Sequence, residues 1–475
     1  MLRNHRKPAR QERKQVPRTG RTIPVRWVVV AVMALLCCAA WTLPEAKTEL
    51  AVAGRLDYRE FLLALVAAGG LASAVIVALA PQPRRRAIAF RVAAVWLGVS
   101  APILCWETYA AFQPARHVMD NPFYAFTYMK TGQGFESSSE LPFKRPPHLH
   151  WEGLSRGDLA VANDDDDPYA RRLTFATDRD GFRNSQEIKQ ADLVFIGDSF
   201  TEAGYMPEEE TFVRLVAAEL GVTARNLATV GYSPPTELIV LKNYGIPCAP
   251  KTVIWQIAES NDLEEAALFQ HWVRDGRPDY LKKLTARVVR PTGEGWQQHS
   301  PTFRLFRVLR SPPIWPLGGT FHDNAGRDYE VRFLQWPSRD QSPVDHAGWP
   351  VIAESIEEGA KLSRERQIRL IVMLVPMKMR VLADAIRMSD AMRQEIRPNW
   401  DIPQAKTMAA YLGALCKKLD VPFLDLTPIL KEHALRGQLV YQPLDTHLSP
   451  AGHRIVADAL EAMLAPAKPP KGNGQ

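Results

Sequence analysis

The stretch 191-ADLVFIGDSFTEAG-204 decides the fold, because a run of apolar residues typical of a buried strand ends here in Gly-Asp-Ser. A serine at such a strand end lies where the next helix begins and free backbone amides gather, which lowers the cost of negative charge. The simpler interpretation of Ser199 is a helix cap, and Asp198 then holds the turn. A catalytic interpretation therefore requires partner residues elsewhere in the chain.

Short apolar segments continue after this stretch and alternate with longer amphipathic ones. The predicted strands cover 192–197, 225–229, 252–257, 369–375 and 422–426, and the predicted helices cover 207–220, 234–245, 350–366, 403–419 and 450–464. Apolar strands separated by helices predict a parallel sheet that is covered on both faces. We therefore expect an α/β domain with three layers, α/β/α, over residues 176–467, and a flexible tail at 468–475.

The alternation breaks between residues 263 and 349, a gap far longer than a normal crossover connection. Within it, the stretch 319-GTFHDNAGRDYEVRF-333 predicts a hairpin. An insertion beside a site is a candidate lid or substrate wall. The tryptophans Trp296, Trp315 and Trp336 would suit a sugar ligand, although core packing explains tryptophans equally well.

The N-terminal part of the chain predicts three transmembrane helices, because it holds three apolar runs at 27–43, 61–80 and 92–112. Residues 1–26 carry nine Lys or Arg against one acid, and residues 81–91 carry four Arg and no acid. The loop at 44–60 holds three basic and four acidic residues. The positive-inside rule therefore predicts a cytoplasmic basic tail at 1–26 and an extracytoplasmic location for everything after residue 112.

Other interpretations of the apolar runs and of the basic charge are weaker. A cleaved signal peptide would explain the first run, but two more runs follow and no clear cleavage site is present. Buried core helices rarely occur as uncharged runs between arginine clusters. The net charge of +7 belongs to the two basic segments, which together carry +12, so the chain shows no nucleic-acid-binding face.

Residues 113–175 suggest a loosely structured extracytoplasmic connector. Its acidic run, residues 164–167, could bind a cation but is more typical of a solvated loop. His148 and His150 alternate like strand neighbours, without further ligands nearby in sequence. Cys248 and Cys416 could pair in an oxidising compartment, and two free buried thiols are the default. We therefore expect no metal and no cofactor.

Polar residues that could cooperate with Ser199 stand at the other predicted strand and loop ends. An ester-cleaving serine needs a base, a group that orients the base, and donors for the oxyanion. Gly231 follows the second strand and Asn261 the third, and 445-DTHLSPAGH-453 stands near the C-terminus. His453 competes with His447 as the base, but it falls inside the last predicted helix.

Four blocks, in this order, resemble the SGNH (GDSL-like) hydrolase family over roughly residues 176–465. They are 196-IGDS-199, 226-NLATVGYSPP-235, 257-IAESNDL-263 and 445-DTHLSPAGH-453. The resemblance implies Ser199 as nucleophile, His447 as general base and Asp445 as its orienting group. It implies an oxyanion hole formed by the backbones of Ser199 and Gly231 and by the Asn261 amide. The stretches 178-DRDGFRN-184 and 254-IWQIAESNDL-263 are similar to those of a membrane-tethered bacterial branch.

The chain departs from the family pattern at two places. Glu259 stands where the family has glycine, so a glutamate facing the pocket becomes a candidate substrate-binding residue. Only Thr446 separates Asp445 from His447, a shorter spacing that resembles the alginate O-acetyltransferase-like branch, as does 375-VPMKMRV-381. Lys378 in that stretch is a candidate contact for a substrate anion, or alternatively a solvated lysine.

The sequence therefore predicts a membrane-anchored serine esterase or O-acyltransferase in the periplasm or another extracytoplasmic space. Its expected substrates are acyl esters, with acetyl as the acyl group that the resemblance implies, on an envelope or exported polysaccharide. A transferase would need a multispanning membrane acyltransferase as donor, as alginate-type systems do. The alternatives are a non-catalytic glycan-binding or scaffold component of a polysaccharide export complex, or a lipid esterase.

Overall fold

The computed structural model describes residues 51–52, 56–111, 135–136, 138, 140–163, 167–277, 300–303, 305, 317–334 and 343–465. The predicted cytoplasmic tail, the first predicted span at 27–43, the tail at 468–475 and the three insertion tryptophans lie outside these residues. Two compact units are present: residues 1–108 with 301–313, and residues 109–300 with 314–475. Each unit is described separately below.

The first unit contains two long apolar helices, α2 (Tyr58–Leu79) and α3 (Arg85–Ala111), joined by the short helix η1 (Gln82–Arg84). Their apolar spans have mean hydropathies of 2.5 and 1.9, which makes both candidate membrane spans. Large side chains such as Leu63 and Leu97 are exposed along them, as expected for surfaces that contact lipid. The described residues therefore contain candidate spans at the second and third predicted positions, whereas the first predicted span lies outside the described residues.

The two helices pack against each other through Trp96 and a small residue. The Trp96 indole donates a hydrogen bond from Nε1 to Ser73 Oγ at 2.7 Å. A Cβ added to Gly69 would lie 2.8 Å from the Trp96 ring, so only glycine allows this approach. Small residues and interhelical hydrogen bonds are the usual means by which membrane helices associate. The third predicted span began at residue 92, but α3 begins at Arg85 and includes the charged Arg91.

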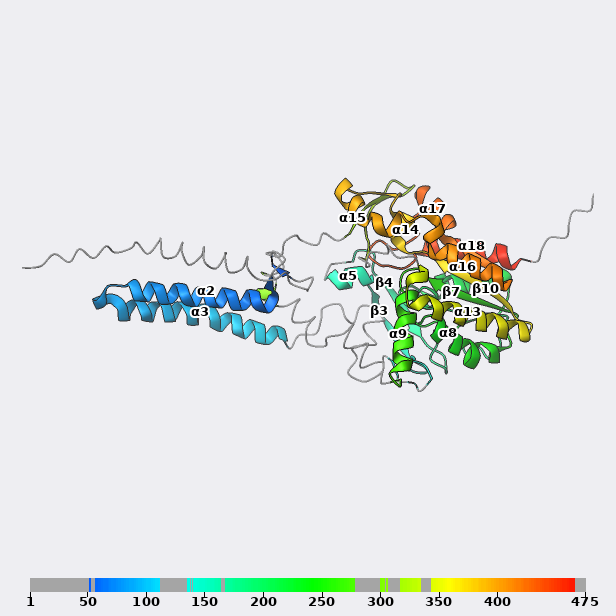
Figure 1. The fold of residues 1–475 in the computed structure, drawn as a ribbon, viewed down its shortest axis with the longest axis horizontal. Helices are drawn as coiled ribbons and strands as arrows, with labels where there is room; N and C mark the ends of the chain where they lie inside the picture. Colours follow the sequence, from blue (N-terminus) through cyan, green and yellow to red (C-terminus); the bar gives the residue numbers. More distant parts are fainter. Residues whose placement is uncertain are drawn as a thin grey trace, which may run out of the picture. The chain divides into compact units, whose positions relative to one another are not determined.

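The second unit is built on a five-stranded sheet with the order β12-β10-β7-β5-β6. Figure 1 labels two of its strands, β7 and β10. The strands are β5 (Leu193–Ile196), β6 (Ala224–Asn226), β7 (Thr252–Ala258), β10 (Arg369–Val375) and β12 (Phe423–Asp425). Every pairing is parallel. The predicted parallel sheet is therefore confirmed, and the carboxyl ends of its strands share one edge.

Alternate residues of the strands fill two hydrophobic cores, one on each face of the sheet. Phe195, Ile254 and Met373 face one core, whereas their neighbours Val194, Val253 and Val372 face the other. The helices that close the first core are α7 (Phe212–Leu220), α14 (Lys378–Leu382), α17 (Leu426–Leu435) and α18 (Pro450–Leu464). Those that close the second are α8 (Pro234–Val240), α9 (Asp262–Arg274), α13 (Gly348–Glu365) and α16 (Met408–Leu419). This is the expected three-layer arrangement.

Side-chain caps set where several of these helices begin. The Ser449 hydroxyl accepts the N–H of Gly452 at 3.1 Å, with Pro450 in the first turn of α18. Thr211 caps α7 in the same way, so this helix begins at Phe212 and not at residue 207 as predicted. Ser233 stands at the N-cap of α8 without a capping bond from its side chain.

Two antiparallel elements lie outside the main sheet. The strands β3 (His150–Ser155) and β4 (Arg171–Ala176) pair with each other, and the short helix α5 (Asp158–Asn163) lies between them in sequence. The described residues of the predicted connector are therefore folded and not loosely structured. Within the long insertion, β8 (Gly318–His322) and β9 (Asp328–Arg332) form the predicted hairpin, and β11 (Ile386–Arg387) extends it to three strands.

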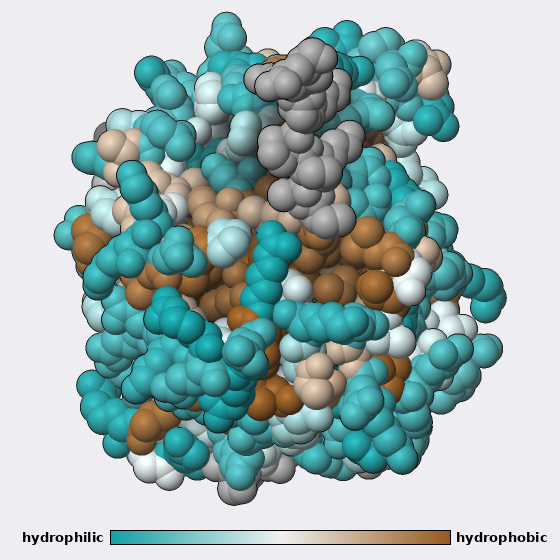
Figure 2. Space-filling view, turned by 90° about the vertical axis from the view of Figure 1, so that its right-hand side faces the viewer, coloured by the Kyte–Doolittle hydropathy of each residue, from teal (hydrophilic) through white to brown (hydrophobic). Residues whose placement is uncertain are grey.

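Figure 2 shows one face of the molecule, on which hydrophilic side chains surround a central area of hydrophobic ones. Apolar atoms contribute more than half of the accessible surface of ordinary folded proteins. This area by itself therefore identifies no partner.

Candidate active site

Three of the predicted site residues follow neighbouring strands of the sheet. Ser199 begins the short helix α6 (Ser199–Glu202) directly after β5, Gly231 follows β6, and Asn261 follows β7. Because β5 lies between β6 and β7, the three residues reach the same edge of the sheet. Ligands of open parallel sheets bind at this edge.

The loop before α18 brings His447 and Asp445 to the same place. His447 Nε2 lies 2.7 Å from Ser199 Oγ, although the two residues are 248 positions apart in sequence. His447 Nδ1 lies 2.6 Å from Asp445 Oδ1, and the His447 backbone N–H donates to the same oxygen at 2.9 Å. These contacts form a chain from hydroxyl to imidazole to carboxylate, with the dimensions that proton transfer requires.

Aromatic rings and charges around His447 set its orientation and its pKa. The Tyr205 ring stacks on the imidazole with the two ring centroids 4.5 Å apart. The Phe200 ring is tilted against the imidazole, with the ring centroids 4.8 Å apart. Burial lowers the pKa of His447, but the charge and hydrogen bond of Asp445, together with Asp158, raise it to about 9. Burial would raise the pKa of Asp445, but His447 holds this pKa below its usual value. The imidazole is thus a strong base that is paired with an ionised carboxylate.

The backbone amides of Ser199 and Gly231 and the side chain of Asn261 are the predicted donors for the oxyanion. Among the described residues, no acceptor is found for the N–H groups of Ser199 and Gly231. Gly231 has φ of +76°, a left-handed conformation that favours glycine. The Asn261 side chain donates from Nδ2 to Asp198 Oδ2 at 3.2 Å, and its Oδ1 accepts the Ser260 hydroxyl at 2.6 Å. These bonds fix the amide and leave one of its two N–H groups for a ligand.

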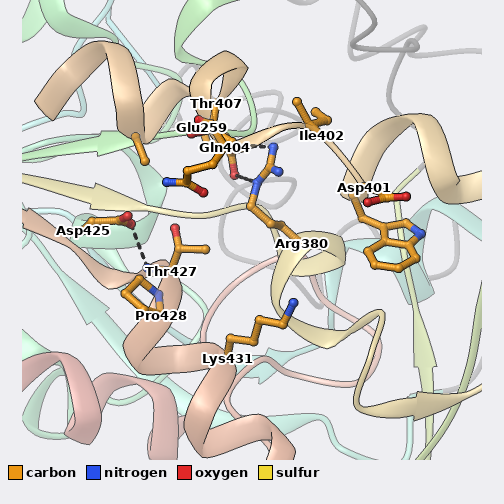
Figure 3. Close-up of a pocket in the computed structure, with 12 residues that line it drawn as sticks. Glu259, Arg380, Asp401, Ile402, Gln404, Thr407, Asp425, Thr427, Pro428 and Lys431 are labelled. Atoms are coloured by element: carbon orange, nitrogen blue, oxygen red, sulfur yellow. Dashed lines mark hydrogen bonds and ion pairs between the residues drawn. The ribbon is translucent and has the colours of Figure 1, made fainter. Parts of the chain in front are cut away.

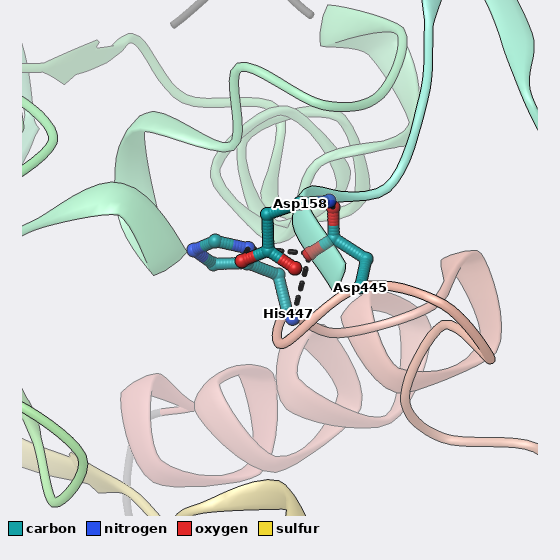
Figure 4. Close-up of side chains that lie close together, drawn as sticks. All are labelled: Asp158, Asp445 and His447. Carbon is teal, nitrogen blue, oxygen red and sulfur yellow. Dashed lines mark hydrogen bonds and ion pairs between the residues drawn. The ribbon is translucent and has the colours of Figure 1, made fainter. Parts of the chain in front are cut away.

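The sequence prediction missed Asp158, which lies beside the histidine (Figure 4). Asp158 Oδ2 is 3.8 Å from His447 Nδ1, and Asp158 Oδ1 accepts the Thr446 backbone N–H at 2.8 Å. The Asp158 backbone N–H in turn donates to Asp445 Oδ2 at 3.0 Å. Burial and repulsion from Asp445 raise the pKa of Asp158 to about 6, against the opposing effects of His447 and Thr446.

The signal that could have identified Asp158 is weak, because Asp158 opens a six-residue helix in the region predicted to be a connector. Asp158, Asp445 and His447 also offer ligand atoms within 4.8 Å of one another. These atoms already bond to one another and to Thr446, so the cluster is occupied by its own hydrogen bonds. His148 and His150, the alternative metal ligands, are exposed and lie beside Glu187 and Glu152 instead.

Lys378 is buried and holds the loop that carries the acid and the histidine. Its ammonium donates to the carbonyl oxygens of Gln442, Pro443 and Asp445 at 2.6, 2.8 and 2.8 Å. Burial lowers the pKa of Lys378 to about 7, against the opposing charges of Asp445 and Asp158. The interpretation as a solvated lysine is therefore wrong. A contact with a substrate anion stays a prediction, and the observed contacts are with carbonyls of the loop.

Glu259 takes part in a buried ion pair. Its carboxylate binds Arg380 through two contacts, Nε to Oε2 at 2.8 Å and Nη2 to Oε1 at 2.6 Å. Glu259 Oε2 also accepts the Met377 N–H at 3.1 Å. The glutamate thus ties the end of β7 to the start of α14. Its predicted contact with substrate stays a prediction.

His453 has a different environment from His447. It lies in α18 and is buried, with Nε2 2.8 Å from the Tyr205 hydroxyl and Nδ1 accepting the Phe212 N–H at 3.1 Å. Burial and the nearby Arg183 lower the pKa of His453 to about 3. Cys248 and Cys416 are both free and buried, as the default interpretation expected.

A small cavity borders this group of residues. It has a volume of about 20 Å³, and its lining includes Phe200, Phe333, Met379 and Thr446. A cavity of this size holds about one water-sized or methyl-sized group. Phe333 follows the strand β9, so the long insertion supplies part of the wall.

One part of the chain matches a known family of SGNH hydrolase-like domains. Residues 335–475 match the family described as "SGNH hydrolase-like domain, acetyltransferase AlgX". This match confirms the predicted resemblance for these residues, which is to a class of ester hydrolases and O-acyltransferases. No match is found among curated proteins.

Several solved structures are similar to this chain. An acetylxylan esterase from Geobacillus stearothermophilus is 15% identical to this chain. The match covers 58% of this chain and 94% of the esterase chain, with a TM-score of 0.29. A GDSL-like lipase from Bacteroides thetaiotaomicron is 12% identical, with coverages of 57% and 86% and a TM-score of 0.27. A putative lipolytic protein of the G-D-S-L family from Desulfitobacterium hafniense is 10% identical, with coverages of 57% and 98% and a TM-score of 0.30.

Proposed function

We propose that the protein cleaves or transfers acyl esters with Ser199 as nucleophile, His447 as general base and Asp445 as the group that orients the histidine. The observation that carries this proposal is the unbroken contact chain from Ser199 Oγ through His447 to Asp445, at 2.7 and 2.6 Å. An imidazole held between a hydroxyl and a carboxylate in this way can accept the hydroxyl proton as the oxygen attacks.

The reaction follows from this geometry. Ser199 Oγ attacks the ester carbonyl while its proton moves to His447 Nε2. The oxyanion is stabilised by the amides of Ser199 and Gly231 and by the free N–H of Asn261. His447 then returns the proton to the leaving alcohol oxygen, and an acyl-serine remains. Water or a sugar hydroxyl attacks this acyl-serine, again with His447 as base, which gives hydrolysis or transfer.

The acyl group that suits this site is small. The cavity beside Phe200 and Thr446 has a volume of about 20 Å³, which fits the methyl group of an acetyl ester. The family match over residues 335–475 carries the description of an acetyltransferase, which agrees with this size. We therefore propose acetyl esters of an envelope or exported polysaccharide as the substrates.

The membrane helices complete the proposal. The apolar run at 27–43 together with α2 and α3 gives three crossings of the bacterial inner membrane, which places the N-terminus in the cytoplasm and the SGNH domain in the periplasm or extracytoplasmic space. A transferase of this design takes its acetyl group from a multispanning membrane acyltransferase. A C-terminal alkaline phosphatase fusion tests the topology, since this reporter is active only outside the cytoplasm. An inactive fusion together with an active cytoplasmic reporter would reverse the proposed orientation.

The nucleophile is tested with the full chain in phospholipid nanodiscs. Turnover of 4-nitrophenyl acetate and labelling by a fluorophosphonate are measured for the native protein and for Ser199→Ala. We expect both signals to be lost in Ser199→Ala and retained in Ser185→Ala, which changes an exposed serine. Labelling that persists in Ser199→Ala would contradict the assignment. A native protein without turnover or labelling would favour the non-catalytic glycan-binding alternative.

A further inference from the structure

A larger polar pocket lies on the same edge of the sheet as Ser199, at the ends of β7, β10 and β12 (Figure 3). Its volume is about 380 Å³. We call it the distal pocket. The residues that line it are Glu259, Arg380, Trp400, Asp401, Ile402, Gln404, Thr407, Ala409, Asp425, Thr427, Pro428 and Lys431.

The distal pocket is within reach of a ligand that extends from the serine. Only β7 separates β10 from β5, so the carboxyl ends of these two strands, which precede Arg380 and Ser199, lie about 10 Å apart across the sheet. The first turn of α14 separates the two sites: Lys378 lines the small cavity, and Arg380 lines the distal pocket. A chain-like substrate can therefore contact both.

The floor of the distal pocket is a buried and rigid polar surface. Glu259 and Arg380 are 3% and 9% exposed, and each is fixed by the other through two contacts. These contacts use Arg380 Nε and Nη2, and among the described residues no acceptor is found for Nη1. The indole Nε1 of Trp400 is buried and has no described partner. The pocket thus offers two N–H donors for a ligand.

The cations that line the distal pocket are already paired with carboxylates. Arg380 is paired with Glu259, and Lys431 lies 2.6 Å from Asp384. Asp401 lies 2.9 Å from Arg397. An acidic ligand would therefore meet no unpaired cation, and the polar walls would not suit a lipid chain. Hydroxyl, amide and carboxylate groups beside an indole ring are instead the groups that bind neutral sugars, by hydrogen bonding and stacking.

We propose that the distal pocket binds a neutral sugar residue of the glycan whose acyl ester reaches Ser199. This inference rests on the proposed function and adds to it the chemical class of the substrate. It makes the enzyme specific for a saccharide chain and not for an isolated acetylated sugar, because only a chain occupies both sites.

Binding is measured on Ser199→Ala full-length protein in nanodiscs by saturation-transfer NMR. The probes are neutral tetrasaccharides of xylose, glucose, mannose and N-acetylglucosamine, with a galacturonic acid tetrasaccharide as the charged contrast. We expect at least one neutral probe to bind. Its binding should weaken at least tenfold in Trp400→Ala and in Gln404→Ala. The matched control is Gln394→Ala, which removes an exposed glutamine of α15 (Asp390–Trp400) outside the pocket and should bind like the parent.

A kinetic experiment compares an acetylated tetrasaccharide with the acetylated monosaccharide of the same sugar as substrates. The reaction is monitored by acetate release and by acetyl transfer. We expect kcat/KM to be at least tenfold higher for the tetrasaccharide than for the monosaccharide. In Gln404→Ala, the two substrates should have nearly equal kcat/KM. The inference is overturned if no neutral probe binds, if the uronic acid probe binds best, or if both glutamine variants behave alike. Ser199-dependent turnover of 4-nitrophenyl acetate without a chain-length effect would overturn it and leave the proposed function standing. Turnover that survives in Ser199→Ala would instead contradict the proposed function.

Discussion

Asp158 Oδ1 accepts the backbone N–H of Thr446 at 2.8 Å, and thereby connects the segment between β3 and β4 to the middle residue of 445-DTH-447. The contact is extensive, since Leu159 and Ala160 also donate their N–H groups to the Leu444 carbonyl. A Cβ added to Gly157 would lie 2.1 Å from that carbonyl oxygen, so the two segments touch backbone to backbone. The short Asp-x-His spacing is thus supported by residues almost three hundred positions earlier.

The first prediction concerns Asp158 as a positioning residue. Asp158→Ala removes the acceptor of the Thr446 N–H, and we expect kcat for 4-nitrophenyl acetate to fall by about tenfold or more with little change in KM. Asp158→Asn keeps an acceptor oxygen and should recover most of this loss. The matched control is Asp390→Ala, which changes an exposed aspartate of α15. Equal activities of the alanine and asparagine variants would contradict a positioning role.

The second prediction is a pH dependence that follows from the pKa of His447. The base must be neutral to accept the Ser199 proton, and the pKa of His447 is raised to about 9 by Asp445 and Asp158, with a smaller contribution from Asp198. The imidazole is therefore protonated below this pH, and kcat/KM should rise with pH up to about 9. This rising limb of the pH profile is measured with 4-nitrophenyl acetate. The spontaneous hydrolysis of the ester is subtracted with a no-enzyme control.

The same limb should move when the neighbouring charge is removed. Asp158→Asn takes away one carboxylate near His447 Nδ1, so the pKa of the imidazole falls and the limb shifts by about one pH unit toward acid. Asp445, Asp198 and the buried Lys378 remain as the other titratable groups close to the site. A limb that stays in place would mean that Asp158 is protonated or screened in the active enzyme.

How much of this could be predicted from the sequence depends on the range of each interaction. The strands were predictable because their apolar runs are local, and the parallel sheet followed from their alternation with helices. The contact of β3, α5 and β4 with the 444–446 loop was not, because it consists of backbone hydrogen bonds that leave no periodic pattern. Lys378 was misjudged for a similar reason, since its three acceptors are carbonyl oxygens that any residue carries.

The third prediction tests whether Lys378 holds the loop or binds substrate. Lys378→Met leaves three carbonyls without their donor, and we expect a loss of about 2 kcal/mol in the free energy of unfolding. The displaced loop should lower kcat while KM stays nearly constant. The control Lys418→Met changes a side chain that is 72% exposed, and its effect should be within about 0.5 kcal/mol. A rise in KM alone, without loss of stability, would instead favour the predicted contact with a substrate anion.

The fourth prediction concerns the buried pair of Glu259 and Arg380. Glu259→Gln leaves the guanidinium with a neutral partner in a site where both side chains are at most 10% exposed. Breaking one side of a buried pair costs about 3–5 kcal/mol, so thermal unfolding should occur roughly 5–10 °C earlier. The control Glu432→Gln removes one partner of an exposed pair with Arg436 and should change stability by less than about 1 kcal/mol.

A double substitution tests whether Glu259 and Arg380 act as a structural pair or whether one of them contacts the substrate. Glu259→Leu with Arg380→Leu removes both charges, and we expect it to be less destabilising than the sum of the single substitutions, because neither charge is left unpaired. Additive effects in this cycle would mean that the two side chains act independently. An unchanged unfolding temperature in Glu259→Gln, combined with a higher KM for an acetylated tetrasaccharide, would show that the carboxylate serves the ligand more than the fold.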